Sequence, residues 1–240
     1  MIDFDAMQNA LSNDTRLLYF CNPQNPTGRV YRKDELVSIL EFCISNDITL
    51  CTDEVHSQFV LDESCQHINI AALAPDTFTK TISMFSPGKT YNISGCSCSA
   101  AVIPDKELRE RFRNQRSEFA SLGRLNIEAT KAAFGDTSSY VPELQEYLRG
   151  NRKLVLETLS KIDGLDLAEH EGTYIAFFDL KNFEIEDISS HFQNHGLGLL
   201  DCGSYGAPTS SRLNFATPRF LLQEGLNRFR SAIDNLSLRG

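Results

Sequence analysis

Met84-Phe-Ser-Pro-Gly-Lys-Thr-Tyr-Asn92 is the stretch around which the chain is organised, and it follows the β-branched run Thr81-Ile82-Ser83. The run predicts a buried strand, so we expect Lys89 in a cleft beyond the end of that strand. A desolvated lysine with a lowered pKa can bond covalently to a carbonyl carbon. Ser86 offers a hydroxyl nearby, and Gly88 lets a ligand approach the backbone. Taken alone, Lys89 has the plainer interpretation of a solvated loop lysine.

Two further apolar runs end in polar residues. The run 17–21 ends at Asn22-Pro-Gln-Asn-Pro-Thr-Gly28, and the run 48–52 ends at Asp53-Glu-Val-His56. Ligands of open parallel sheets bind at the carboxyl ends of the strands, so three strands would deliver an Asn, an Asp and a Lys to one edge. This set suits pyridoxal phosphate: the Lys holds the aldehyde, the Asp pairs with the ring nitrogen, and the Asn donates to the ring oxygen.

The composition narrows the class of protein. The 240 residues are 41% hydrophobic and 23% charged, as in ordinary globular proteins, and no run is long and apolar enough to span a membrane. A net charge of -9 without a basic stripe argues against a nucleic-acid partner. Seven cysteines without a Cys-x-x-Cys pair predict reduced thiols in the cytoplasm. Five histidines without ligand spacing predict no metal site.

The hydrophobic periodicity predicts an α/β protein. A helix over 33–46 links the strands 17–21 and 48–52 as a βαβ crossover. Further helices are expected over 105–119, 125–134, 138–162, 185–194 and 218–236, and further strands over 97–103, 173–180 and 212–216. Gly150 is expected to mark a bend in the long helix. The change to an α+β pattern after that helix predicts two domains, 1–145 and 146–240.

Four motifs occur in a fixed order: Asn22-Pro-Gln-Asn-Pro-Thr-Gly28, Asp53-Glu-Val-His56, Ser86-x-x-Lys89-Thr-Tyr-Asn92 and Arg212-Leu-Asn-Phe-Ala-Thr-Pro-Arg219. Together they resemble the fold-type I pyridoxal-phosphate enzymes of the class I/II aminotransferase family. Within the family, the bacterial cystathionine β-lyase (C–S lyase) branch is the most similar. That likeness depends on His56, where most aminotransferases have Tyr, and on the stretches 89–95 and 171–174.

The resemblance implies a partial, mostly parallel large-domain sheet over 1–145, followed by a small α+β domain over 146–240. It covers about the later two thirds of the family fold. The family's N-terminal arm, phosphate-binding loop and stacking aromatic have no counterpart in the sequence. Ser97 stands where the family commonly has a phosphate-binding arginine, and Gly88 replaces the usual Ser or Ala. Members of the family are homodimers, and we expect the same here.

The resemblance also implies roles for individual residues. Lys89 is the expected catalytic residue. The expected cofactor-binding residues are Asn25, Asp53, His56, Ser86 and Lys89. The expected substrate-binding residues are Asn25 and Arg212, because Arg212 opens its predicted strand and can take the substrate carboxylate bidentately.

The expected reaction is β-elimination from cystathionine or a related cysteine S-conjugate, an amino-acid substrate, to give a thiol, pyruvate and ammonia. Transamination by a class I/II aminotransferase is the alternative, since it uses nearly the same residues. An alternative of another class is an incomplete, catalytically inactive family fragment, because the phosphate-binding loop is missing.

Overall fold

The computed structural model describes residues 2–115 and 122–238, which form two compact units. Unit 1 comprises Met1–Pro23, Tyr31–Gln58 and Gln66–Ser138. Unit 2 comprises Gln24–Val30, Phe59–Cys65 and Ser139–Gly240. Two short loops from the first quarter of the chain therefore belong to the unit that is otherwise built from its later part.

Unit 1 consists of a sheet with helices. In chain order its elements are α1 (Phe4–Asn9), β1 (Leu17–Cys21), α2 (Lys33–Ser45), β2 (Thr49–Asp53), the 3-10 helix η1 (Ile70–Leu73), β3 (Thr81–Phe85), η2 (Ser94–Cys96), β4 (Ala100–Val102), α3 (Lys106–Asn114) and α4 (Arg124–Phe134). The helix predicted over 105–119 corresponds to α3, and the last part of that range, 116–119, lies outside the described residues. The strand predicted over 97–103 is shorter, because β4 covers Ala100–Val102 alone.

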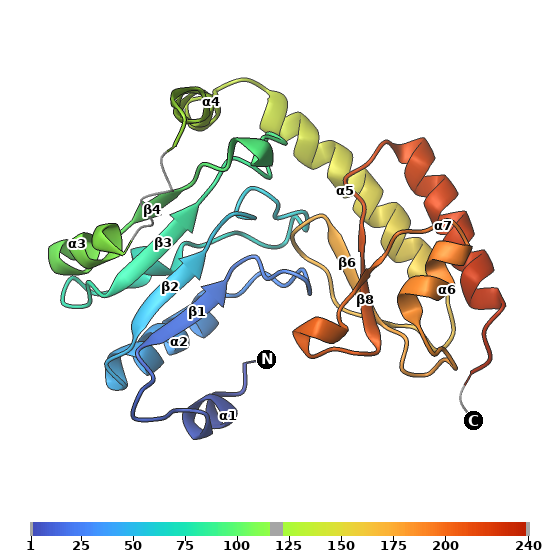
Figure 1. Ribbon diagram of the computed structural model, residues 1–240, viewed down its shortest axis with the longest axis horizontal. Helices are drawn as coiled ribbons and strands as arrows, with labels where there is room; N and C mark the ends of the chain where they lie inside the picture. Colours follow the sequence, from blue (N-terminus) through green and yellow to red (C-terminus); the bar gives the residue numbers. More distant parts are fainter. Residues whose placement is uncertain (1, 116–121, 239–240) are drawn as a thin grey trace. The chain divides into compact units, whose positions relative to one another are not determined.

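The sheet of unit 1 has the order β1-β2-β3-β4 (Figure 1). β1, β2 and β3 are parallel, and β4 is antiparallel to β3. Asp53 pairs with Cys21 on one side and with Met84 on the other, so the three parallel strands end at nearly the same level. The predicted α/β fold with a mostly parallel sheet is confirmed.

Helix α2 covers one face of this sheet (Figure 1). Arg32 is the residue that precedes the helix, and its N–H donates to the Glu35 carboxylate at 2.9 Å. This contact gives a partner to one of the backbone N–H groups that a helix start leaves without one. The buried residues of α2 recur at helical spacing and pack against Phe20 and Leu50: Leu36, Ile39, Leu40 and Cys43. Each buried Leu or Ile of this kind contributes roughly 1.5–3 kcal/mol.

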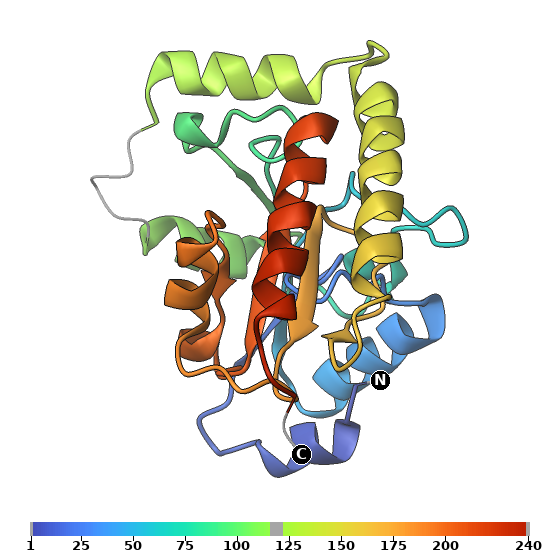
Figure 2. The same cartoon turned by 90° about the vertical axis from the view of Figure 1, so that its right-hand side faces the viewer.

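Unit 2 is an antiparallel sheet with helices packed on it. Its elements are α5 (Tyr140–Leu159), β5 (Asp166–Leu167), β6 (Ile175–Asp179), α6 (Ile188–Asn194), β7 (Leu200–Asp201), the 3-10 helix η3 (Gly203–Tyr205), β8 (Ser210–Asn214) and α7 (Arg219–Asp234). The strand order is β5-β6-β8-β7, and all neighbours are antiparallel. Figure 2 shows α7 over this sheet, where Phe229 packs edge-on to Phe178 with ring centres 5.2 Å apart.

α5 runs without a break from Tyr140 to Leu159, through Gly150, where a bend was expected. The glycine serves close packing instead: a Cβ at this position would lie 2.3 Å from Nη2 of Arg219. The Arg219 Nε donates to Asn151 Oδ1 at 3.0 Å, and Asn151 is fully buried. Asn151 Nδ2 donates in turn to two backbone carbonyls, at 2.8 and 2.9 Å. This network joins α5 to the segment between β8 and α7.

The described helices include none that is long and apolar enough to cross a membrane. The seven cysteines are free thiols. Cys43 is fully buried in α2, and this burial raises the pKa of its thiol to about 11. A thiol of this kind behaves as a small apolar side chain.

Candidate active site

Four of the predicted site residues lie in unit 1, beyond the carboxyl ends of its parallel strands. Asp53 is the last residue of β2, and His56 follows it by three positions. Ser86 and Lys89 follow the end of β3 at Phe85. The backbone ladder continues past the strands, because the Glu54 N–H donates to Met84 O at 2.9 Å. This ladder holds the loop after β2 beside the loop after β3.

The Asp53 carboxylate accepts two hydrogen bonds. Its Oδ2 accepts the Tyr19 hydroxyl at 3.0 Å, and its Oδ1 accepts the Val55 N–H at 3.1 Å. Partial burial and the Asp53 carboxylate raise the pKa of Tyr19 to about 12. The sequence analysis did not single out Tyr19. Strand alternation could have predicted the contact: Cys21 pairs with Asp53, and Tyr19, two residues before Cys21, lies on the same face of the sheet.

His56 is 3% exposed, and it lies close to two charges. Burial lowers the pKa of His56 to about 4; the Lys89 ammonium lowers it further, while the Asp53 carboxylate opposes the change. The imidazole is therefore neutral at pH 7. The structure thus brings Asp53, His56 and Lys89 together within unit 1.

The Lys89 side chain is exposed, and within the described part of the chain no carboxylate lies at ion-pair distance from its ammonium. Its loop is held by internal hydrogen bonds. Ser86 Oγ accepts the Gly88 N–H at 3.1 Å and donates to Cys98 O at 3.1 Å. A Cβ at Gly88 would lie 3.1 Å from Ser86 Oγ and 3.3 Å from Ser94 Cα, so the loop leaves little room for the usual Ser or Ala.

The remaining two predicted residues, Asn25 and Arg212, lie in unit 2 and contact each other. Arg212 Nη1 donates to Asn25 Oδ1 at 3.0 Å. The guanidinium carbon also lies 5.7 Å from the centre of the Tyr205 ring, within cation–π range. Arg212 does not open its strand as predicted, because β8 begins at Ser210 and Arg212 pairs with Phe177.

Behind Asp53 lies a buried pair that the sequence did not indicate. The Glu54 side chain is fully buried, and its Oε2 lies 2.7 Å from Nε2 of His67. Asn22 Nδ2 donates to Ile68 O at 3.2 Å on the same side. The pair links the loop before η1 to the end of β2.

The described side chains form no cluster that could hold a metal ion. No group of three or more His, Cys, Asp or Glu side chains suited to a metal ion occurs in residues 2–115 and 122–238. The donors are one carboxylate, one neutral imidazole, one hydroxyl and one free ammonium in unit 1, with an amide and a guanidinium in unit 2. The groups of unit 1 can hold a ring nitrogen and move a proton, and the pair in unit 2 can bind an organic anion.

Known proteins resemble this chain over nearly all of its length. Residues 1–229 match the family described as aminotransferase class I and II. Cystathionine beta-lyase PatB of Bacillus subtilis (strain 168) is 28% identical over 241 residues, which cover 97% of this chain and 62% of PatB. The chain therefore spans about three fifths of the length of this relative.

Solved structures give the same result. The crystal structure of OvoB superposes with a TM-score of 0.92 at 34% identity, over 98% of this chain and 62% of OvoB. The pyridoxal-phosphate-bound C–S lyase from Staphylococcus hominis superposes with a TM-score of 0.87 at 28% identity, over 97% of this chain and 61% of the lyase. These likenesses confirm the predicted fold-type I architecture. The chain belongs to the class I and II aminotransferase family.

Proposed function

We propose that this chain acts as a pyridoxal-phosphate-dependent C–S β-lyase on cystathionine or a related cysteine S-conjugate. The observation that carries the proposal is the group formed by Asp53, His56 and Lys89 at the carboxyl end of the parallel strands. The similarity to PatB and to the C–S lyase from S. hominis favours elimination over transamination.

The residues of unit 1 fit the ring of pyridoxal phosphate. A carboxylate oxygen has two acceptor positions, so Asp53 Oδ2 can bind a ring N–H while it keeps the Tyr19 hydroxyl. The neutral His56 imidazole has a donor for the ring oxygen. The Lys89 amine, once it has lost its proton, suits the aldehyde. Ser86 can donate to the phosphate only if its proton leaves Cys98 O. When bound, this cofactor supplies an electron sink that acidifies the substrate Cα–H.

The chain's own groups bind the substrate and move its proton. Arg212, held by Asn25, binds the substrate α-carboxylate through its guanidinium. Lys89 Nζ takes the Cα proton as general base. The C–S bond at Cβ then breaks, and the sulfur leaves with the bonding electrons as a thiolate. Water supplies the ketone oxygen of pyruvate, and the amino group is released as ammonia.

The aminotransferase alternative uses the same residues, because a substrate without a leaving group at Cβ cannot eliminate. The two reactions are separated by their products: elimination releases a thiol and ammonia, whereas transamination consumes a keto acid and releases neither. An inactive family fragment would do neither reaction and would bind no cofactor at Lys89.

Two further expectations belong to this proposal. We propose a homodimer, as the family resemblance implies, and light scattering of the purified protein tests it. We also propose that the protein works in the cytoplasm, since seven free thiols fit a reducing compartment. Localisation of a tagged full-length protein tests the second expectation.

The decisive experiment starts with the visible absorbance of the purified protein after pyridoxal phosphate is added. We expect a band that Lys89→Ala removes and Lys106→Ala keeps, because Lys106 is an exposed lysine of the same unit. Pyruvate and thiol released from L-cystathionine are then measured for all three proteins. Pyruvate release by the Lys89→Ala protein at the wild-type rate would overturn the assignment, and absence of the band would favour the inactive fragment.

A further inference from the structure

The loop that carries Asn25 has a shape that depends on one glycine. Gly28 has a φ of +75°, which side chains other than glycine adopt rarely. Its N–H donates to Gln24 O at 2.8 Å, and the Gln24 N–H donates to Arg29 O at 2.8 Å. A Cβ at Gly28 would lie 2.6 Å from Cδ2 of His170. The loop 24–30 is thus a closed turn pressed against the segment 170–172 of unit 2.

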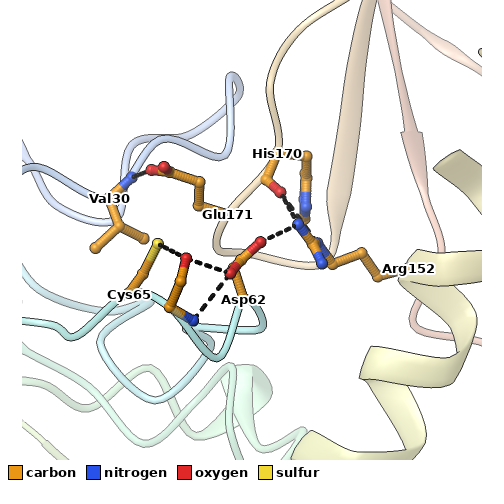
Figure 3. Close-up of polar contacts among 7 residues, drawn as sticks. Val30, Asp62, Cys65, Arg152, His170 and Glu171 are labelled. Carbon is orange, nitrogen blue, oxygen red and sulfur yellow. Dashed lines mark hydrogen bonds and ion pairs between the residues drawn. The ribbon is translucent and has the colours of Figure 1, made fainter.

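The segment 170–172 forms hydrogen bonds with this turn at two residues, Gly28 and Val30. The N–H groups of Glu171 and Gly172 both donate to Gly28 O, at 2.9 and 2.7 Å. The Glu171 side chain reaches past them, and its Oε2 accepts the Val30 N–H at 2.8 Å (Figure 3). Glu171 is 5% exposed and Val30 is fully buried, so water cannot replace this contact easily.

The same segment is anchored on its other side. Glu171 O accepts the N–H groups of Leu61 and Asp62, each at 2.9 Å. Arg152 of α5 donates through Nε to His170 O at 3.0 Å and through Nη2 to Asp62 Oδ2 at 2.7 Å (Figure 3). The segment 170–172 therefore connects α5, through Arg152, to the turn that carries Asn25.

We propose that Glu171 is a positioning residue that holds Asn25 against Arg212 and so preforms the carboxylate-binding pair. Pro26 gives this turn no backbone N–H, and at the exit of the turn the Glu171 carboxylate accepts the Val30 N–H. Asn25 Oδ1 in turn fixes the guanidinium of Arg212. The consequence for substrate binding rests on the proposed function, whereas the consequence for the turn does not.

The first test measures amide hydrogen exchange of the segment 24–30 in the full chain. Glu171→Ala leaves a buried donor unpaired, and we expect exchange of this segment to rise about 10-fold or more while α7 is unchanged. Glu171→Gln keeps an acceptor oxygen and is expected to restore most of the protection. Glu169→Ala, an exposed glutamate two positions away, is the matched control and is expected to have no effect. Unchanged exchange in Glu171→Ala, or an equal rise in α7, would overturn the proposal.

The second test separates binding from chemistry in the cofactor-loaded protein. A looser carboxylate pair weakens substrate binding, so Glu171→Ala is expected to raise KM for L-cystathionine about 10-fold with kcat within about 2-fold of wild type. An equal loss in kcat with unchanged KM would contradict a positioning role. Arg212→Ala serves as the reference: if its KM equals that of wild type, the proposed carboxylate role of Arg212 fails, and the exchange result still decides whether Glu171 holds the turn.

Discussion

Acid should destabilise unit 2 through His170. This histidine is 3% exposed and packs edge-on against Phe215, with ring centres 5.3 Å apart. Burial lowers the pKa of His170 to about 4, and the nearby Arg152 guanidinium lowers it further. The unfolded chain binds the proton near pH 6.5 instead. Protonation therefore favours the unfolded state over the whole interval between these two values.

The size of the effect follows from the two pKa values. Their difference of about 2.5, at about 1.4 kcal/mol for each pH unit, corresponds to roughly 3–4 kcal/mol. The stabilisation is fully present above pH 6.5 and is lost as the pH falls towards 4, because the folded pKa of this cationic group is depressed. At pH 5 the loss is already about 2 kcal/mol.

Two measurements check this prediction. The chemical shift of the His170 imidazole, followed by NMR against pH, gives its pKa directly. Urea unfolding at pH 8 and pH 5 gives the loss of unfolding free energy, and the loss in His170→Gln should be smaller than in wild type by about 2 kcal/mol. The comparison across pH removes any constant destabilisation by the variant. A titration midpoint near 6.5, or equal losses in the two proteins, would refute the reasoning.

Three further predictions concern single residues. Gly28→Ala should lower the unfolding free energy of unit 2 by well over 1 kcal/mol in urea unfolding, because the new Cβ would meet His170. Gly206→Ala is the control: its φ is +86°, but nothing lies within 4 Å of the new Cβ, so it should lose only about 1 kcal/mol. Equal losses in the two variants would contradict the close approach of Gly28 to His170. Asn151→Ala leaves two buried carbonyl contacts unmade and should lower the unfolding free energy by about 2 kcal/mol, and a loss below about 0.5 kcal/mol would contradict that role. Cys43 should resist thiol reagents at pH 8 until the protein unfolds, because burial raises the pKa of its thiol to about 11. Mass spectrometry of the native protein after treatment with the reagent measures this, and a label on Cys43 would contradict the prediction.

Local patterns in the sequence were sufficient for the parallel sheet. The β-branched runs and the helical spacing over 33–46 predict β1, α2 and β2 within one or two residues. Because parallel strands deliver their following residues to one edge, the grouping of Asp53 with Lys89 was also predictable. The contact between Tyr19 and Asp53 needed only strand alternation and register, and that signal was overlooked.

Contacts across long sequence separations could not be predicted in this way. Asn25 and Arg212 are 187 residues apart, and neither composition nor periodicity indicates that they touch. The burial of Glu171 could not be predicted either. The polar run Glu169-His170-Glu171 is typical of a solvated segment. The position of Arg212 within β8 was missed because the preceding serines give no strand signal.

The membership of the loops 24–30 and 59–65 in unit 2 has a consequence for the order of folding. Phe59 and Leu61 belong to the same apolar core as α5 and α7, although more than 75 residues separate them from the start of α5. During synthesis these loops emerge before α5 and α7, and they cannot complete this core until α7 has been made. Closing such long loops slows folding, so the apolar side chains of the two loops stay unburied in the nascent chain until α7 is available.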